Sequence, residues 1–94
     1  MTVPSFEWDP TKATENLRRH RVSFEEAMSV FLDPLARVFS DPDRSTAEDR
    51  GIMIGHSERG RLLVFSFTER AGEIRMISAR VSTRHERRRH EEHA

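Results

Sequence analysis

The sequence predicts an α+β fold, in which an antiparallel β-sheet meander packs against two N-terminal helices and a short C-terminal helix follows. Three observations lead to this fold class. Two helix-start signals lie near the N-terminus, three apolar runs separated by short glycine-containing turns fill residues 50–81, and a further helix-start signal lies at Thr83. Short links of this kind join neighbouring strands as hairpins, which indicates a meander. No internal repeat is visible, so residues 1–94 are expected to form one domain.

The first predicted helix follows a short strand at residues 6–8. Asp9 is a favourable N-cap, and Pro10 suits the first helical position, where its missing N–H costs nothing. Ala13 and Leu17 are expected to supply the apolar contacts of this helix.

The second predicted helix begins with a capping box, in which Ser23 is the N-cap and Glu26 is the third helical residue. It ends at Asp33, because the residue before a proline avoids helical geometry. Apolar residues follow at helical spacing and predict a stripe that faces the core: Phe24, Ala27, Met28 and Phe31.

The remaining chain reads as strands, turns and one more helix. Strands are expected at residues 35–39, 50–56, 61–68 and 73–81, and a polar, mobile loop at residues 40–49. The third of these strands is almost continuously apolar, which is typical of a central strand. Thr83 and Glu86 form a second capping box, which opens a terminal helix that is polar nearly all round. Such a helix needs a partner or a ligand to stay ordered.

The net charge of zero hides an asymmetry, because residues 1–50 carry a charge of −3 and residues 51–94 a charge of +3. A polyanion would therefore bind the C-terminal half. The absence of cysteine excludes disulfides and thiolate metal sites, and the five histidines show no metal-ligand spacing, so no cofactor is expected. Neither a membrane span nor a signal peptide is evident, which favours a cytoplasmic protein.

Arginine dominates the basic residues, since Lys12 is the only lysine among 16 basic side chains. Arginine is concentrated in the strand at residues 74–80 and in the helix start at residues 83–89. The guanidinium group is a fixed fork of donors that fits phosphate oxygens and keeps its charge. This pattern favours a phosphate site, with a salt-bridged surface as the alternative.

Several segments together resemble the BrnT toxins, which are ribonuclease toxins of bacterial type II toxin–antitoxin pairs with a fold similar to the RelE toxins. The resemblance rests on residues 6–9, on Lys12, Asn16 and His20, and on residues 22–27, 77–80 and 86–89. It implies RNA cleavage without a metal, growth arrest, and neutralisation by a BrnA-like antitoxin that binds operator DNA, with a toxin–antitoxin heterotetramer as the assembly. The chain departs from the family pattern at Arg21 and at His90, where the family often has tyrosine.

Cleavage of this kind uses the 2′-hydroxyl as the nucleophile and leaves a 2′,3′-cyclic phosphate. It needs a base, cations that hold the phosphorane charge, and an acid for the leaving oxygen. The candidates for this chemistry are Arg80, Lys12, His20, Arg61 and His56. The candidates for RNA contacts are Trp8, Asn16, Arg75, Arg84 and Arg88.

Structural roles compete with these assignments. Arg75 and Arg80 are an odd number of residues apart, so they face opposite sides of the sheet unless a bulge intervenes, and Arg75 then serves as a surface ion pair. Trp8 is also a core candidate, and His20 also suits a helix end. The nuclease hypothesis would be rejected if Arg80 were locked in an ion pair with a carboxylate and no cationic hollow lay beside it.

The rival function is a non-catalytic, toxin-like binding module that acts with an antitoxin as co-repressor. An independent DNA-binding protein is disfavoured, because no helix-turn-helix is evident and the net charge is zero.

Overall fold

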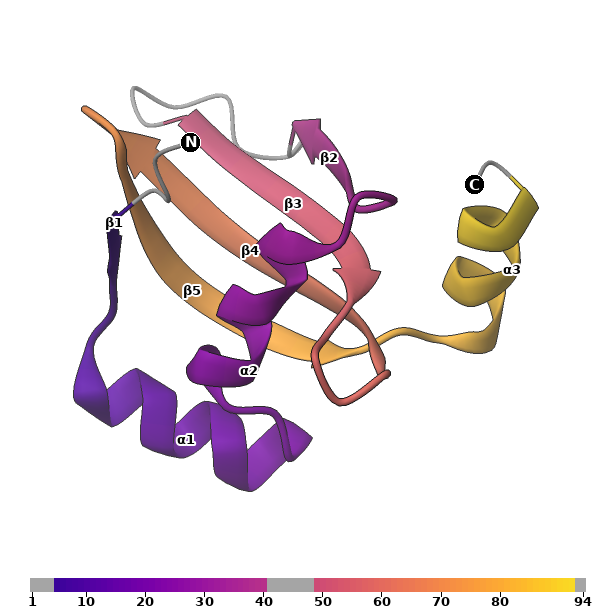
Figure 1. Ribbon diagram of the computed structural model, residues 1–94. Helices are drawn as coiled ribbons and strands as arrows, with labels where there is room; N and C mark the ends of the chain where they lie inside the picture. Colours follow the sequence, from indigo (N-terminus) through magenta and orange to yellow (C-terminus); the bar gives the residue numbers. More distant parts are fainter. Residues whose placement is uncertain (1–4, 41–48, 93–94) are drawn as a thin grey trace.

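The computed structural model describes residues 5–40 and 49–92 and has the predicted α+β class (Figure 1). The predicted loop at residues 40–49 falls almost wholly outside the described residues. The elements in chain order are β1 (Ser5–Glu7), α1 (Pro10–His20), α2 (Phe24–Met28), the 3₁₀ helix η1 (Ser29–Leu32), β2 (Arg37–Ser40), β3 (Asp49–His56), β4 (Leu62–Arg70), β5 (Glu73–Val81) and α3 (Arg84–Glu92).

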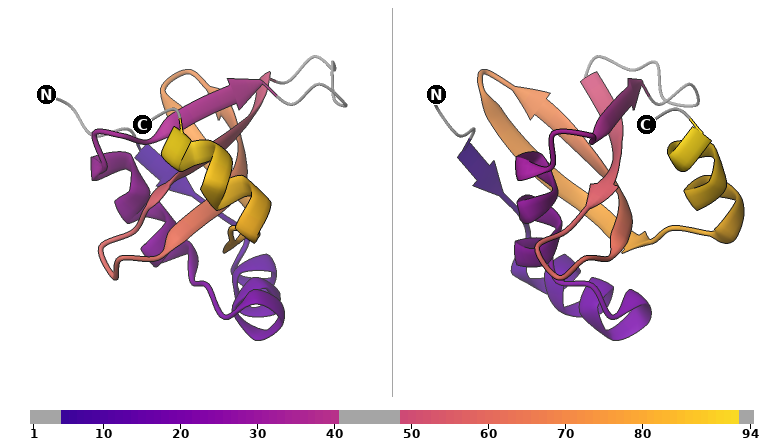
Figure 2. Two further views of the ribbon diagram at one scale, coloured as in Figure 1. Left: turned by 90° about the vertical axis from the view of Figure 1, so that its right-hand side faces the viewer. Right: turned by 45° about the vertical axis from the view of Figure 1, so that its right-hand side comes forward.

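A single sheet separates the helices into two layers. Helices α1 and α2 lie on one side of the sheet and α3 lies on the other (Figure 2). The main core lies between the sheet and the two N-terminal helices, and it contains Val22, Phe24, Ala27, Val30, Met53, Leu63, Phe65, Phe67, Ile74, Met76 and Ala79. Leu62 and Ile54 are also buried but lie outside this cluster, on the side of α3.

The strand order is β1-β5-β4-β3-β2, so the nearly apolar strand β4 is central, as predicted. Strands β2 to β5 form the expected antiparallel meander. The sheet also has a fifth strand, because β1 pairs in parallel with β5 along residues 73–75. No hairpin turn joins these two strands, and the pairing therefore left no local signal in the sequence.

The helix-start signals are confirmed. The Asp9 carboxylate accepts a hydrogen bond from Thr11 N at 2.9 Å, and the Ser23 hydroxyl accepts one from Glu26 N at 3.0 Å. Glu86 N donates to the Thr83 hydroxyl at 3.1 Å, and Thr83 N donates to Glu86 Oε1 at 2.8 Å, which completes the box. The carboxylate of Glu26, by contrast, leaves its own helix end and binds residues of the β3–β4 turn.

The prediction that Leu17 packs into the core is wrong, since it is 49% exposed. Asn16 is the buried residue of α1. Its amide donates to Val22 O at 2.9 Å and to Ala79 O at 2.8 Å, and it accepts from Ala79 N at 3.0 Å. Asn16 thus pairs with β5 beyond the end of β1, where the backbone would otherwise lack a partner.

A β-bulge in β5 changes which side chains share a face. Ser66 pairs with Ser78, but the next residue, Phe67, pairs with Met76, so one residue of β5 is extra. The bulge brings Arg75 and Arg80 to the same face, which is the face turned toward α3. The strict alternation expected from their spacing is therefore broken.

Candidate nucleic-acid interface beneath the C-terminal helix

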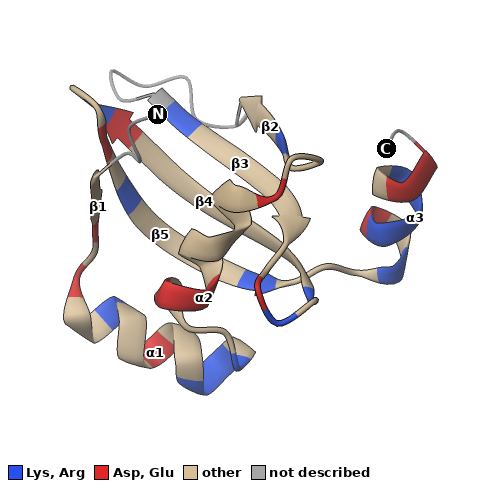
Figure 3. Ribbon diagram, in the orientation of Figure 1, with Lys and Arg blue, Asp and Glu red and all other residues tan. Residues whose placement is uncertain are grey.

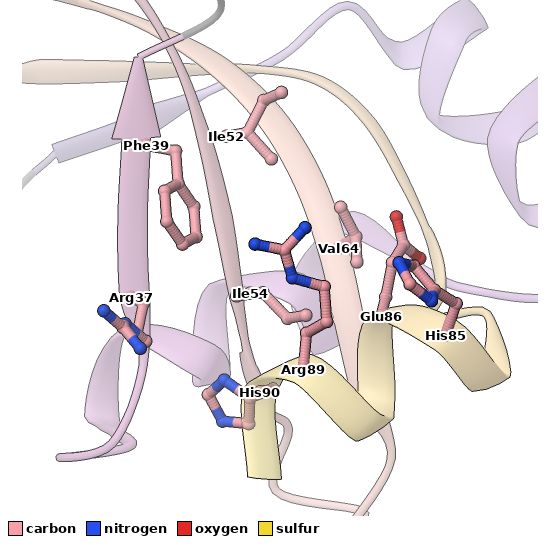
Figure 4. Close-up of a pocket in the computed structure, with 9 residues that line it drawn as sticks. All are labelled: Arg37, Phe39, Ile52, Ile54, Val64, His85, Glu86, Arg89 and His90. Atoms are coloured by element: carbon pink, nitrogen blue, oxygen red, sulfur yellow. The ribbon is translucent and has the colours of Figure 1, made fainter. Parts of the chain in front are cut away.

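The clearest concave site lies between α3 and the outer face of the sheet. It is a hollow of about 420 Å³ whose walls come from β2, β3, β4 and α3 (Figure 4). Its lining residues are Arg37, Phe39, Ile52, Ile54, Val64, His85, Glu86, Arg89 and His90.

The floor of the hollow is apolar because of strand register. Ile54 pairs with Val64 and Ile52 pairs with Phe39, so these side chains project from neighbouring strands toward the same face. Arg37 lies two residues before Phe39, with its guanidinium 5.8 Å from the Phe39 ring centroid. Arg89 extends from α3 into the space above this floor (Figure 4). The site therefore combines an apolar base with cationic walls.

One end of the hollow is closed by an ion pair. Arg80 Nη1 and Nη2 each donate to one oxygen of Glu86 at 2.8 Å, which is a bidentate geometry. The hydrogen bonds from Arg80 are the main reason that the pKa of Glu86 falls to about 2. The guanidinium of Arg80 is thus held by a carboxylate, but a hollow with Arg37 and Arg89 lies directly beside it. The sequence hypothesis would fail only if the pair were present without the hollow.

His90 anchors the second turn of α3 against the sheet. It is only 5% exposed, and neither ring nitrogen has a hydrogen-bond partner among the described residues. Its ring centroid lies 5.9 Å from that of His56. Burial lowers the pKa of His90 below its ordinary value, and the neighbouring His56 adds to this effect. The neutral imidazole is therefore the form that fits beneath α3.

His56 is held by Asp33 at the margin of the same region. Its backbone N donates to Asp33 Oδ2 at 2.7 Å, and its Nδ1 lies 3.6 Å from that oxygen. Burial raises the pKa of Asp33, but hydrogen bonds from the backbone of His56 and Leu35 outweigh it and keep the pKa below its ordinary value. The side chain of His56 is 41% exposed. A carboxylate thus fixes the backbone of His56 and lies beside an accessible imidazole, an arrangement that can support proton transfer.

Arg61 belongs to a separate cluster around the buried carboxylate of Glu26. Its Nε donates to Glu26 Oε2 at 2.9 Å, its Nη2 donates to Glu26 Oε1, and Nη2 also donates to Arg21 O at 2.9 Å. The Ser57 hydroxyl donates to Glu26 Oε2 at 2.7 Å. These bonds, with that from Arg61 the strongest, hold the pKa of Glu26 below its ordinary value despite burial. The guanidinium predicted to meet phosphate is engaged within the fold.

The other predicted residues are spread over the molecule. Lys12 and His20 lie on α1, across the sheet from α3 (Figure 2). Trp8 packs edge-to-face on Phe24 at 5.7 Å, and Arg75 pairs with Glu7 at 3.3 Å. Figure 3 shows basic residues on α1, at the β3–β4 turn, at the end of β5 and on α3. Only His56 and Arg80, of the predicted catalytic residues, lie beside the hollow.

Comparison with known protein families assigns this geometry to a family. A family model described as the ribonuclease toxin BrnT of type II toxin–antitoxin systems matches residues 8–86. The chain belongs to the BrnT family. It is therefore a ribonuclease toxin of a type II toxin–antitoxin system, and such a system implies an antitoxin as its partner.

A solved structure supports the fold of this BrnT-family chain. The crystal structure of the Brucella abortus ribonuclease toxin BrnT is similar with a TM-score of 0.68 and 24% sequence identity, over 86% of this chain and 99% of that one. A comparison with curated proteins gave no match.

Sequence reasoning missed several residues of the hollow in this BrnT-family chain. Arg84 and Arg88 were singled out on α3, but the residues that line the hollow come from its other side: His85, Glu86, Arg89 and His90. These have helical spacing, yet a helix without an apolar stripe gives no indication of which side packs. Asp33 and Arg37 were also missed, because each appeared as an ordinary loop or edge-strand residue.

Two further properties concern the described residues 5–40 and 49–92. No group of three or more His, Asp or Glu side chains there is arranged to hold a metal ion. None of the helices in this part of the chain has the length and apolar character of a membrane span.

Proposed function

We propose that this chain is an endoribonuclease toxin that cleaves RNA without a metal ion, leaves a 2′,3′-cyclic phosphate and arrests growth in the cytoplasm. Residues 1–94 act as one toxin domain with a RelE-like fold. The observation that carries the proposal, together with family membership, is the accessible imidazole of His56, which lies 3.6 Å from the Asp33 carboxylate and beside a hollow with cationic walls.

The chemistry follows from the positions of these groups. His56 takes the proton of the attacking 2′-hydroxyl, and Arg37 and Arg89 stabilise the charge on the phosphorane. As the 2′-oxygen bonds to phosphorus, the bond from phosphorus to the 5′-oxygen breaks, and the departing 5′-oxygen takes a proton from water. Arg80 acts differently from the sequence-based assignment, since its ion pair with Glu86 fixes α3 and thereby positions Arg89. Arg84 and Arg88, on the exposed side of α3, contact the RNA backbone where it leaves the hollow.

The remaining predicted residues divide into two groups. Asn16, Arg61 and Trp8 serve the fold, because their polar or aromatic groups are engaged inside it. Lys12 and His20 form a second RNA-contacting surface on α1. Arg75 lies on the opposite face of the sheet and contacts RNA there only if its pair with Glu7 opens.

The partner is a BrnA-like antitoxin that binds operator DNA and joins the toxin in a heterotetramer. A second function is favoured by one observation: the guanidinium groups of Arg80 and Arg61 are both held by carboxylates. The alternative is therefore a non-catalytic module that acts as co-repressor with the antitoxin. Expression without the antitoxin separates the two, since only the nuclease arrests growth.

The direct test uses purified full-length chain and RNA in EDTA, with analysis of the cleaved ends. We expect cleavage with a cyclic phosphate, and a loss of about 100-fold in rate for His56→Ala, the lower range for removal of a general base. Glu58→Gln is the control, because Glu58 is exposed in the neighbouring turn. Circular dichroism of each variant checks the fold. If both naked and ribosome-bound RNA stay intact with the unmodified chain, the enzyme proposal is wrong.

A further inference from the structure

We infer that the hollow beneath α3 binds one unpaired nucleobase, stacked between the ring of Phe39 and the guanidinium of Arg89. This inference rests on the proposed function and specifies its substrate as single-stranded RNA. The argument comes from the chemistry of the lining, from accessibility and from charge.

The lining suits a flat aromatic ligand. The floor, formed by Ile52, Ile54 and Val64, is apolar. The volume of the hollow, about 420 Å³, lies within the range of about 300–1,000 Å³ that is usual for small-ligand sites. Phe39 stands on β2 at one side of this floor, and the flat guanidinium of Arg89 extends over the floor from α3 (Figure 4). Unpaired bases are recognised by stacking on aromatic rings and guanidinium planes. A base inside a duplex does not expose its faces and cannot enter.

The stacking groups are accessible. Phe39 is 49% exposed on the edge strand β2, although an aromatic ring of this size is usually buried. Arg37 lies against one side of the ring. Arg89 is exposed and has no ion-pair partner among the described residues. No ion pair among the described residues therefore competes for the guanidinium of Arg89.

The charge around the hollow favours an anionic ligand. Among the described residues, Glu86 is the one acidic residue in the lining, and its carboxylate is neutralised by Arg80. Arg89, which extends over the floor, is placed to face a phosphate that enters with the base. An acidic peptide could pair with Arg89 but would not need two flat stacking groups, so the observations favour RNA.

Binding is tested separately from cleavage with an uncleavable ligand. The probe is a fluorescein-labelled 2′-O-methyl oligoribonucleotide, measured by anisotropy with the full-length chain. It is compared with the same strand in a duplex and with an abasic strand of equal length. We expect the single strand to bind more tightly than either, because only it offers a base to the hollow.

A matched pair of variants locates the site. Phe39→Ala should weaken binding of the single strand about 10-fold, which is within the range for loss of one base stack. Val38→Ala is the control, since Val38 is 57% exposed but points to the other face of the same strand, and it should leave binding unchanged. Phe39→Tyr keeps a stacking ring and should retain affinity, which guards against a folding defect.

The outcomes are distinguishable. Equal binding of single strand, duplex and abasic strand overturns the inference, as does an equal effect of the two alanine variants. Binding of a fluorescein-labelled poly-glutamate peptide that is lost in Phe39→Ala, without binding of the oligonucleotide, overturns the inference and assigns the hollow to a protein segment instead. Phe39-dependent binding of an RNA that is never cleaved supports the base site and rejects the nuclease. RNA cleavage at the same rate in Phe39→Ala as in the unmodified chain supports the nuclease and rejects the base site.

Discussion

Arg80 and Glu86 face one another across the junction of β5 and α3, with both Nη–Oε distances at 2.8 Å. The pair joins the last strand to the first turn of the terminal helix, while Glu86 also caps that helix through Thr83 N. One carboxylate therefore both starts α3 and holds it against the sheet. The hollow exists because α3 is held at this position.

Replacing Glu86 with glutamine should loosen α3 without unfolding the sheet. The amides of α3 should exchange faster in hydrogen–deuterium exchange, while those of β4 should be unchanged, because the core lies on the other face. Glu91→Gln is the control, since the Arg87–Glu91 pair is exposed and separated by 4.0 Å. Equal exchange in both variants would show that the Arg80–Glu86 pair does not hold the helix.

The same pair predicts an acid limit for α3. The pKa of Glu86 is lowered from 4.5 to about 2, so its contribution is complete above pH 4.5 and is lost as the pH falls through about 2. In a variant that lacks His90, the protection of the α3 amides against exchange, corrected for the pH dependence of free amides, should therefore begin to fall below pH 4.5 and lose the contribution of this pair near pH 2.

His90 predicts a second, milder acid response of α3. Its pKa in the attached helix lies below 6.5, since it is buried and faces His56 and Arg37, with Asp33 and Glu91 opposing them more weakly. Attachment is thus undisturbed above pH 6.5 and weakens as the pH falls below that value, because the detached helix binds a proton more readily.

A pair of variants checks the role of His90. In His90→Phe, a ring still fills the buried position but cannot take a proton. The opening of α3, measured from amide exchange corrected for the pH dependence of free amides, should therefore no longer increase as the pH falls from 7 to about 5. His85→Gln is the control, because His85 is exposed on the same helix and should leave the response intact. An unchanged acid response in His90→Phe would assign it to another group.

Asp33→Asn should lower the cleavage rate about 10-fold, at the modest end of contributions from an orienting group. The asparagine oxygen can still accept from His56 N, but the amide nitrogen cannot replace the oxygen that accepts from Leu35 N. Circular dichroism and urea unfolding therefore check that the fold is kept while the carboxylate beside Nδ1 is lost. Single-turnover rates at saturating RNA measure the effect. If the loss appears only in RNA affinity, Asp33 does not act through the imidazole.

Glu26→Gln should destabilise the fold by about 3 kcal/mol, the lower value for removal of one partner from a buried ion pair. Arg61, Arg59 and the Ser57 hydroxyl all converge on this carboxylate, which is 4% exposed. Because the pKa of Glu26 is lowered, its contribution is present above pH 4.5 and is lost as the pH falls through the lowered value.

Urea unfolding at neutral pH measures this effect. Glu25→Gln is the matched control, since Glu25 is the exposed neighbour on the same helix and should change the midpoint little. A midpoint for Glu26→Gln that equals the control would mean that the charge is not part of the buried network.

Local signals in the sequence predicted most of the fold. The caps at Asp9, Ser23 and Thr83 and the glycine-containing turns act between residues a few positions apart, so the helix starts and the meander were visible without a structure. Leu17 was assigned to the core incorrectly, because periodicity does not reveal that Asn16 is needed to pair with β5.

The candidate site was only partly visible. His56 and Arg80 were identified, but the bulge that places Arg75 and Arg80 on one face depends on register between strands. Arg37, Arg89 and Asp33 join the site from three separate segments. Arg37 and Arg89 come together only because α3 packs on the sheet. Helix spacing did not separate Arg89 from Arg88, since α3 has no apolar stripe.

The amino-acid sequence by itself determined the element types, the meander and the concentration of arginine in the last third, because these depend on local geometry and composition. The tertiary structure alone decided which arginines are engaged by carboxylates and which face the hollow. The physical reason is that an ion pair such as Arg80–Glu86 depends on distances set by folding, and a guanidinium held by a carboxylate is no longer available to a phosphate.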